Sequence, residues 1–175
     1  MANFNQYFPL ENKLEGTVFE NDPNDTGGAT KFGLTVDDLQ EYNLDENGDG
    51  KIDWQDVKAL PAEDAAKVLK KLYWDHFSAD SINNQLVAEY VVDAGLNQGR
   101  VLIAKFVQSI VGVTVDGHPG ANTLAAINAA DQASLFESLK QKRIARYQAI
   151  VASNPSDQEY YNGWINRVNA IQFSA

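Results

Sequence analysis

The sequence predicts an all-α fold of about eight helices, built from 175 residues. Apolar residues recur at the spacing of a helix, as in the run of Leu86, Tyr90, Val91 and Ala94. Residues that favour helix ends stand between the apolar segments. Hydrophobic residues make up 44% of the chain, which is enough for a packed core and excludes a disordered protein.

The N-terminal half is expected to contain three helices. Residues 3–14 form the first, which Pro9 either kinks or replaces with a shorter helix. Thr35 has the side chain of an N-cap and precedes a short helix that reaches Tyr42. A third helix, with Pro61 in its first turn, should run to about His76.

The C-terminal half is expected to be helical over most of its length. Ser81 should cap one helix, the run Gly95–Gly99 should break or bend the chain, and Asp131 should cap a long helix reaching about Ala152. Pro155 then separates this helix from the last one. The other expected helices span residues 100–111, ended by Gly112, then 121–130 and 157–173.

Charge and composition exclude several kinds of partner. The formal net charge is −10 and the isoelectric point is near 4.5, so neither nucleic acid nor an anionic membrane surface is an expected partner. The chain has no cysteine, which excludes disulfides and thiolate chemistry. The basic run at residues 140–146 is interpreted as a solvated helix face.

The sequence predicts neither membrane insertion nor a secretory signal. No apolar run reaches the roughly 20 residues that a spanning helix needs. The first ten residues lack a basic n-region and an apolar h-region. We therefore expect synthesis in the cytoplasm without a Sec signal, and a protein that acts as a monomer.

Residues 45–56 fit the twelve-residue loop of an EF-hand calcium site. Gly50 supplies the sharp turn, and position 12 is Asp rather than the usual Glu, as in dockerin-type loops. We expect a structural Ca²⁺ here and no organic cofactor; the alternative is an acidic surface turn without metal. The predicted ligands are Asp45, Asn47, Asp49, the backbone carbonyl of Lys51, Asp53 and Asp56.

A second polar stretch, residues 14–35, is too rich in glycine and polar residues for a regular helix or strand. Glu15 follows an apolar turn, where partial burial suits a proton donor, and Asp25 and Thr30 come after it. Glu, Asp and Thr in this order are typical of a lysozyme-like site. There an acid protonates the glycosidic oxygen, a second carboxylate steadies positive charge or activates water, and a hydroxyl places the water. Asp22 is the alternative second carboxylate, and a solvated loop is the non-catalytic alternative.

The chain resembles the glycoside hydrolase family 108 muramidases, of the phage endolysin and "secretion activator" type. Its second half resembles the peptidoglycan-binding module that completes this family. We expect a catalytic region at residues 1–98 and a binding region at 99–175, packed as one compact unit. The matching motifs are Leu14-Glu15-Gly16, Asp22-Pro23, Asp25 to Thr30, Gly33-Leu34-Thr35, Lys71 to Trp74, Asp93 to Gly99, Val115-Asp116-Gly117 with Thr123-Leu124, and Gly163 to Val168.

The resemblance implies a lysozyme-like enzyme that hydrolyses the β-1,4 bond between N-acetylmuramic acid and N-acetylglucosamine in peptidoglycan glycan strands. Glu15 matches the catalytic Glu of the family's Glu-Gly-Gly-Tyr motif. Here Thr17 and Val18 stand in place of the second Gly and the Tyr, so this turn must differ or need no glycine. The calcium loop is an insertion relative to the family pattern. An enzyme of this type acts at the cell wall or periplasm after holin- or secretion-dependent release.

Tyr73, Asp93 and Asn97 are the candidate substrate-binding residues. Packing, capping or a buried polar contact is the alternative for each of them. Two further functions stay open for the whole chain: a non-catalytic peptidoglycan-binding protein, and a calcium-dependent interaction protein with a degenerated site.

Overall fold

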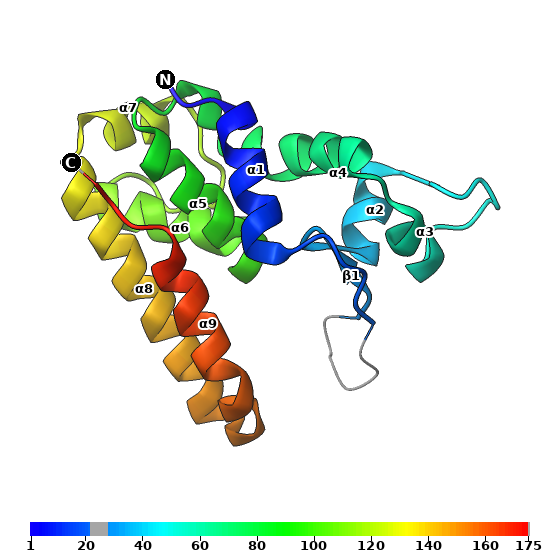
Figure 1. Ribbon diagram of the computed structural model, residues 1–175. Helices are drawn as coiled ribbons and strands as arrows, with labels where there is room; N and C mark the ends of the chain where they lie inside the picture. Colours follow the sequence, from blue (N-terminus) through cyan, green and yellow to red (C-terminus); the bar gives the residue numbers. More distant parts are fainter. Residues whose placement is uncertain (22–27, 175) are drawn as a thin grey trace. The chain divides into compact units, whose positions relative to one another are not determined.

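The computed structural model describes residues 1–21 and 28–174, and it confirms the all-α prediction (Figure 1). Within these residues the chain forms nine α-helices, three short helices of other types and one two-stranded sheet. The chain divides into two compact units. We call Asn3–His76 the N-terminal unit, and the segment that starts at Phe77, together with Met1–Ala2, the C-terminal unit. The expected boundary at residues 98–99 lies inside the C-terminal unit, and as a boundary between functional regions it stays a prediction.

The N-terminal unit packs short helices around a small hairpin. Its core includes the fully buried side chains of Tyr7, Leu34, Leu39, Val57 and Trp74. Its elements are α1 (Phe4–Glu15), β1 (Thr30–Lys31), β2 (Leu34–Thr35), α2 (Val36–Tyr42), α3 (Trp54–Ala59), α4 (Ala62–Leu69) and the π-helix η1 (Lys70–Trp74).

The hairpin is antiparallel and pairs Thr30 with Thr35 and Lys31 with Leu34. Its two turn residues, Phe32 and Gly33, both have positive φ, at 56° and 73°. Two-residue hairpin loops with this geometry match the twist of the strands. The left-handed conformation of Phe32 costs about 1–2 kcal/mol, and burial of its ring, which is 5% exposed, offsets that cost.

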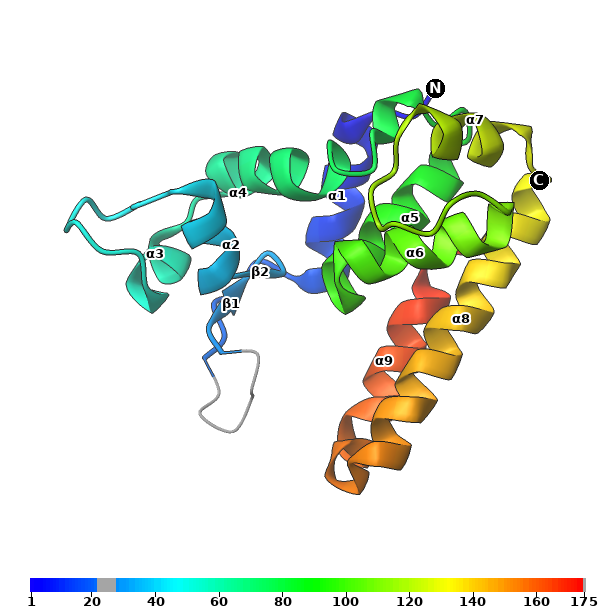
Figure 2. The ribbon, with the colours of Figure 1, turned by 180° about the vertical axis from the view of Figure 1, so that it is seen from behind.

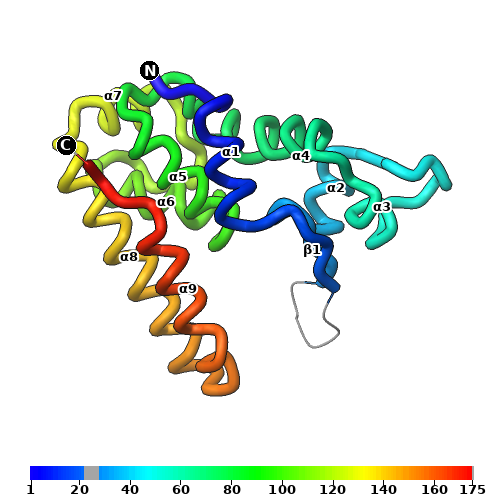
Figure 3. The backbone as a smooth tube through the Cα atoms, in the orientation of Figure 1, coloured from blue at the N-terminus to red at the C-terminus, as the bar shows by residue number. Residues whose placement is uncertain are grey.

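The C-terminal unit is a set of packed helices (Figure 2). Helices α8 and α9 contact each other as a long antiparallel pair, which Figure 3 traces from end to end. The elements are the 3₁₀ helix η2 (Ala79–Ser81), α5 (Gln85–Gln98), α6 (Arg100–Val111), α7 (Ala121–Ala129), α8 (Gln132–Ser153), the 3₁₀ helix η3 (Pro155–Asp157) and α9 (Gln158–Ala170).

Several predicted helix ends are confirmed. Thr35 caps α2 in a capping box with Asp38, Asp131 caps α8, and Gly112 ends α6 in the left-handed conformation. Helix α1 is continuous through Pro9, so Pro9 does not start a shorter helix.

One predicted helix start is wrong, and two predicted ends are confirmed only in part. Ser81 belongs to a separate 3₁₀ turn, and the helix begins at Gln85 with Asn84 as its N-cap. The helix after Pro61 is α-helical only to Leu69 and then widens into the π-helix η1. Helix α5 does not break at Gly95, although it does end at Gly99, where φ is 92°. The glycine at position 95 is explained by close packing, because a Cβ there would lie 2.6 Å from the Phe77 ring.

Candidate active site

Glu15 is the last residue of α1 and is half-buried. Gly16 ends the helix with φ at 82°, and its N–H donates to the carbonyl of Asn12 at 3.1 Å. The chain therefore leaves the helical conformation directly after Glu15. The carbonyl end of a helix disfavours negative charge, which suits a side chain that has to deliver a proton.

The Thr17-Val18 departure from the family motif has a simple structural account. Among the described residues the non-glycine positions with positive φ are Phe32, Asn43 and Ser78, so neither Thr17 nor Val18 is among them. Gly16 alone provides the left-handed turn after Glu15. A β-branched residue is therefore tolerated at position 17, because this turn needs no glycine there.

Thr30 is half-buried in β1, and its backbone is paired on one side with Thr35 and on the other with Glu20. It pairs with Thr35 across the hairpin, and its backbone exchanges two hydrogen bonds of 2.9 Å with Glu20. The segment that follows Glu15 is thus joined to the strand that carries Thr30. The two candidate carboxylates, Asp25 and Asp22, lie outside the described residues.

The hairpin is also tied to α3. The Lys31 ammonium donates to the backbone carbonyls of Lys58 at 3.0 Å and Leu60 at 2.7 Å. A cation at these carbonyls satisfies groups that the end of α3 leaves without an intrahelical partner. The strand of Thr30 and the helix that follows the predicted calcium loop are therefore held together.

Tyr73 contacts the core of the same unit. Its hydroxyl donates to Asp38 Oδ1 at 2.6 Å, while Asp38 Oδ2 accepts from the backbone N–H and hydroxyl of Thr35. Tyr73 is 8% exposed and stands in the π-helix η1. These contacts connect η1 to the start of α2, and sugar binding by Tyr73 stays a prediction.

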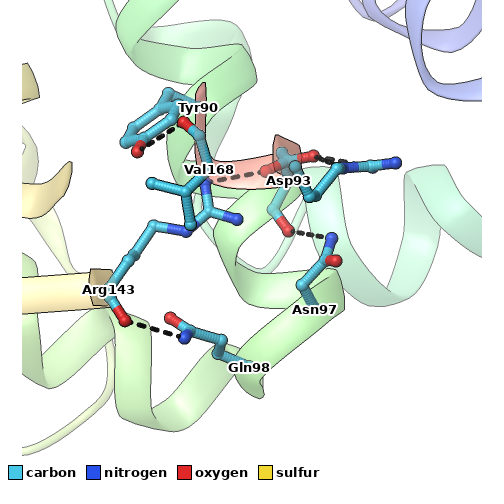
Figure 4. A network of polar contacts seen from close by, with 7 residues as sticks. Tyr90, Asp93, Asn97, Gln98, Arg143 and Val168 are labelled. Atoms are coloured by element: carbon cyan, nitrogen blue, oxygen red, sulfur yellow. Dashed lines mark hydrogen bonds and ion pairs between the residues drawn. The ribbon is translucent and has the colours of Figure 1, made fainter. Parts of the chain in front are cut away.

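Asp93 lies in a buried ionic cluster of the C-terminal unit (Figure 4). Its Oδ2 lies 2.8 Å from Arg143 Nη1, and its Oδ1 is 2.7 Å from both Nε and Nη2 of Arg167. Asp93 and Arg143 are fully buried. Asn97 donates to the backbone carbonyl of Asp93 at 2.9 Å. The structure thus gives Asp93 and Asn97 internal contacts, and their contact with substrate stays a prediction.

The burial of Arg143 corrects the sequence interpretation of residues 140–146 as a solvated face at this one position, whereas Arg146 is exposed. Leu139, Arg143 and Tyr147 recur every four residues on α8, and all three are buried. The Arg143 guanidinium lies 4.7 Å from the centroid of the Tyr90 ring. Burial raises the pKa of Tyr90 to about 12, although Arg143 acts in the opposite direction.

The predicted calcium loop is closed by hydrogen bonds. Asp45 accepts from the backbone N–H groups of Gly48, Asp49 and Gly50, at 2.8, 3.2 and 2.8 Å. Gly48 and Gly50 provide the turns, with φ at 74° and 84°. The loop has the carboxylate, amide and carbonyl oxygens that Ca²⁺ prefers. However, no group of three or more His, Cys, Asp or Glu side chains within residues 1–21 and 28–174 is arranged to hold a metal ion.

Asp56, the twelfth residue of the predicted loop, hydrogen-bonds to backbone N–H groups, and its role as a calcium ligand stays a prediction. It is fully buried, and its carboxylate accepts from the backbone N–H groups of Glu46, Asn47 and Asp53 at 2.8, 3.1 and 2.8 Å. Burial alone would raise the pKa of Asp56, but these N–H groups outweigh it and lower the pKa below its usual value. Asp56 therefore closes the loop by capping α3.

A cavity of about 650 Å³ lies at the turn between α6 and α7. The buried side chain of Gln108 holds this turn. It donates to Asp116 Oδ1 at 2.7 Å and to the His118 carbonyl at 3.3 Å, and it accepts from Gly117 N–H at 2.8 Å. Hydrogen bonds from the His118 N–H and then Gln108 lower the pKa of Asp116. The lining residues are Gly112, Val113, Thr114, Asp116, His118, Gly120, Ala121, Asn122 and Thr123.

Comparisons with known proteins identify families for both halves of the chain and a solved structure with a similar fold. A family model described as "Glycosyl hydrolase 108" matches residues 12–99, and one described as "Predicted Peptidoglycan domain" matches residues 103–169. Eleven solved chains match. One, from "Structure of Brucella abortus SagA", is 27% identical over 96% of this chain and 90% of its own, with a TM-score of 0.81. No curated protein sequence matches. Among the described residues, no helix has the length and apolar character to cross a membrane.

Proposed function

Because the chain belongs to the glycosyl hydrolase 108 family, we propose that it is a peptidoglycan N-acetylmuramidase in which Glu15 is the general acid. Membership makes it a glycoside hydrolase, and the match to a peptidoglycan domain points to peptidoglycan as the substrate and to the cell wall as the place of action. The observation that carries the proposal is the position of Glu15. It is half-buried at the end of α1, within the matched region.

In this proposal Glu15 gives its proton to the oxygen that links C1 of N-acetylmuramic acid to N-acetylglucosamine. The C1–O bond breaks as positive charge develops on the ring, and water adds to C1. A carboxylate of the segment between Glu20 and Thr30, Asp25 or alternatively Asp22, stabilises that charge or takes the proton of the water. The Thr30 hydroxyl orients the water. Glu15 is reprotonated at the end of the cycle.

Product analysis tests the bond that is cut. Purified peptidoglycan is digested, the new reducing ends are reduced with borohydride, and the products are separated and identified by mass spectrometry. A muramidase leaves N-acetylmuramitol ends. N-acetylglucosaminitol ends would assign the other glycosidic bond, and a digest without new reducing ends would overturn the proposal of hydrolysis.

We also propose that the C-terminal unit holds peptidoglycan at the cavity beside Gln108. This binding function is the second candidate for the whole chain, because it does not require an active Glu15. The cavity has the size of a small-molecule site, and threonine, asparagine, histidine and aspartate side chains line it. It lies within the region matched by the peptidoglycan domain.

Filling this cavity is expected to weaken binding to the cell wall. In the full chain carrying Glu15→Gln, Asn122→Trp places a large ring at the exposed start of α7, and we expect about tenfold less protein to sediment with peptidoglycan at a subsaturating concentration. Ala129→Trp is the matched control, because Ala129 is the exposed last residue of α7 and does not line the cavity. Equal sedimentation of both variants and the parent would contradict the assignment. Peptidoglycan stripped of its peptides tells whether the glycan or the peptide is bound.

We further propose that residues 45–56 bind Ca²⁺, through Asp45, Asn47, Asp49, the Lys51 carbonyl and Asp53. The support for this proposal is the sequence pattern, which supplies oxygen ligands at the positions of an EF-hand loop, and Asp56 as a further ligand stays a prediction.

Calcium is expected to raise the melting temperature of the wild-type protein. At a concentration 100 times the Kd, binding should add about 2.7 kcal/mol to the free energy of unfolding. Asp49→Asn should abolish this gain while leaving the melting temperature in chelator unchanged, because Asn keeps the oxygen that accepts from Lys51 N–H. Asp56→Asn should lose about 1–2 kcal/mol even in chelator. Asn keeps only one of the two carboxylate oxygens, so either the loop N–H groups of Glu46 and Asn47 or the N–H of Asp53 at the start of α3 loses its acceptor. A wild-type melting temperature that ignores calcium would contradict the proposed ion.

A further inference from the structure

Trp54, the first residue of α3, is the most exposed aromatic side chain of the N-terminal unit among the described residues, with 43% of its surface accessible. Its ring centroid lies 6.3 Å from that of Phe19, at an interplanar angle of 38°. Val18, which precedes Phe19, is 74% exposed. A single exposed apolar residue needs no explanation, but a paired aromatic surface next to a candidate catalytic site does.

The chain places this aromatic pair beside Thr30. Phe19 directly precedes Glu20, whose backbone exchanges two hydrogen bonds of 2.9 Å with Thr30. On the other side, Lys31 holds the C-terminal end of α3 through the carbonyls of Lys58 and Leu60. Figures 1 and 2 show α3 next to the hairpin within this unit. The backbone next to Phe19 is therefore hydrogen-bonded to Thr30, and the helix that carries Trp54 is hydrogen-bonded to the neighbouring Lys31.

Trp54 is also held rigidly. It stands between Asp53, the N-cap of α3, and the buried Asp56, and these two residues form a capping box. Asp56 in turn fastens the backbone of Glu46 and Asn47. A ring on such a fixed backbone loses little conformational freedom when it binds a ligand.

We propose that Trp54 and Phe19 form a stacking surface for a sugar ring of the glycan strand, beyond the pair of sugars whose bond is cleaved. This inference rests on the proposed function. A pyranose presents an apolar face of C–H groups, which complements the negatively charged face of an indole ring. A polymer extends past the bond that is cut, and a contact to a remote unit that is equally strong in the ground state and the transition state adds to binding alone. The segment that the sequence predicts to bind calcium then has a second task, since it presents Trp54 to the substrate.

Calorimetric titration with a peptide-free N-acetylglucosamine–N-acetylmuramic acid hexasaccharide tests the surface. In the full chain carrying Glu15→Gln, Trp54→Ala is expected to raise the Kd about tenfold, and Trp54→Phe to restore most of the affinity. In the active enzyme Trp54→Ala should raise KM by a similar factor and change kcat by less than about twofold. Tyr160→Ala is the matched control, because Tyr160 is also 43% exposed but lies in the C-terminal unit.

The outcomes separate this inference from the proposed function. An active wild type whose Trp54→Ala variant keeps its Kd and KM overturns the stacking surface alone. A wild type that neither binds nor cleaves the glycan overturns both. Phe19→Leu leaves Trp54 in place and should raise the Kd above that of the Glu15→Gln parent, which tests the surface again if Trp54→Ala is unstable. Trp54-dependent self-association in sedimentation velocity, with an unchanged Kd, would assign the surface to a second copy of the chain and overturn the inference.

Discussion

Asp93→Ala is expected to destabilise the C-terminal unit by about 3–5 kcal/mol, a large part of the 5–15 kcal/mol that holds a typical domain together. The carboxylate is fully buried and neutralises two guanidinium groups at 2.7–2.8 Å. Removing it leaves the charge of Arg143 inside the protein, where the lost hydration is not replaced. Arg143 also packs on the Tyr90 ring, so its displacement would disturb the core around α5 and α8.

Urea denaturation followed by circular dichroism measures this loss. Glu63→Gln is the matched control, because it removes a carboxylate whose pair with Lys67, at 3.3 Å, is exposed, and it should leave the unfolding midpoint almost unchanged. Combining Asp93→Ala with Arg143→Met should recover part of the stability, since the buried charge is then removed with its partner. A midpoint for Asp93→Ala equal to that of Glu63→Gln would show that the cluster contributes little.

Helix ends determined by neighbouring residues could be predicted from the sequence, whereas ends chosen by packing could not. Thr35 and Asp131 cap their helices with local hydrogen bonds, and the residue types alone indicate them. Ser81 and Asn84 are both good N-caps three positions apart, and local preference does not decide between them. The π-helix at 70–74 likewise lacks a local signal, because Lys, Leu, Tyr and Trp all occur in ordinary α-helices.

The candidate site shows the same division. The position of Glu15 at the end of a helix follows from the apolar turn before it and the glycine after it, both of which are visible in the sequence. The burial of Arg143 and Asp56 is not visible in this way, because charged residues are rarely buried and their partners lie elsewhere in the chain or in the backbone. The four-residue spacing of Leu139, Arg143 and Tyr147 was the signal that could have revealed the buried arginine.

Glu15→Gln is expected to lower the rate of peptidoglycan hydrolysis by about 10²–10⁴-fold. The glutamine side chain has nearly the same size as glutamate and can still accept hydrogen bonds, so folding and glycan binding should change little. It cannot donate a proton to the leaving oxygen, and the transition state then expels an unprotonated sugar alkoxide. Glu20→Gln is the matched control, since Glu20 is exposed, lies five residues further along and should keep near-wild-type activity.

A substrate that does not need the proton makes this prediction specific to general acid catalysis. A dinitrophenyl glycoside of the same sugars has a leaving group that departs as a stable anion, so Glu15→Gln should lose much less activity on it than on peptidoglycan. The pH profile should change as well. We expect the wild-type rate on peptidoglycan to fall on the alkaline side, where the acid is deprotonated, and the residual rate of the variant to lack that decrease. Equal losses on both substrates would show instead that Glu15 acts by its charge or by positioning the sugar. Asp25 and Asp22 would then have to be tested as the acid.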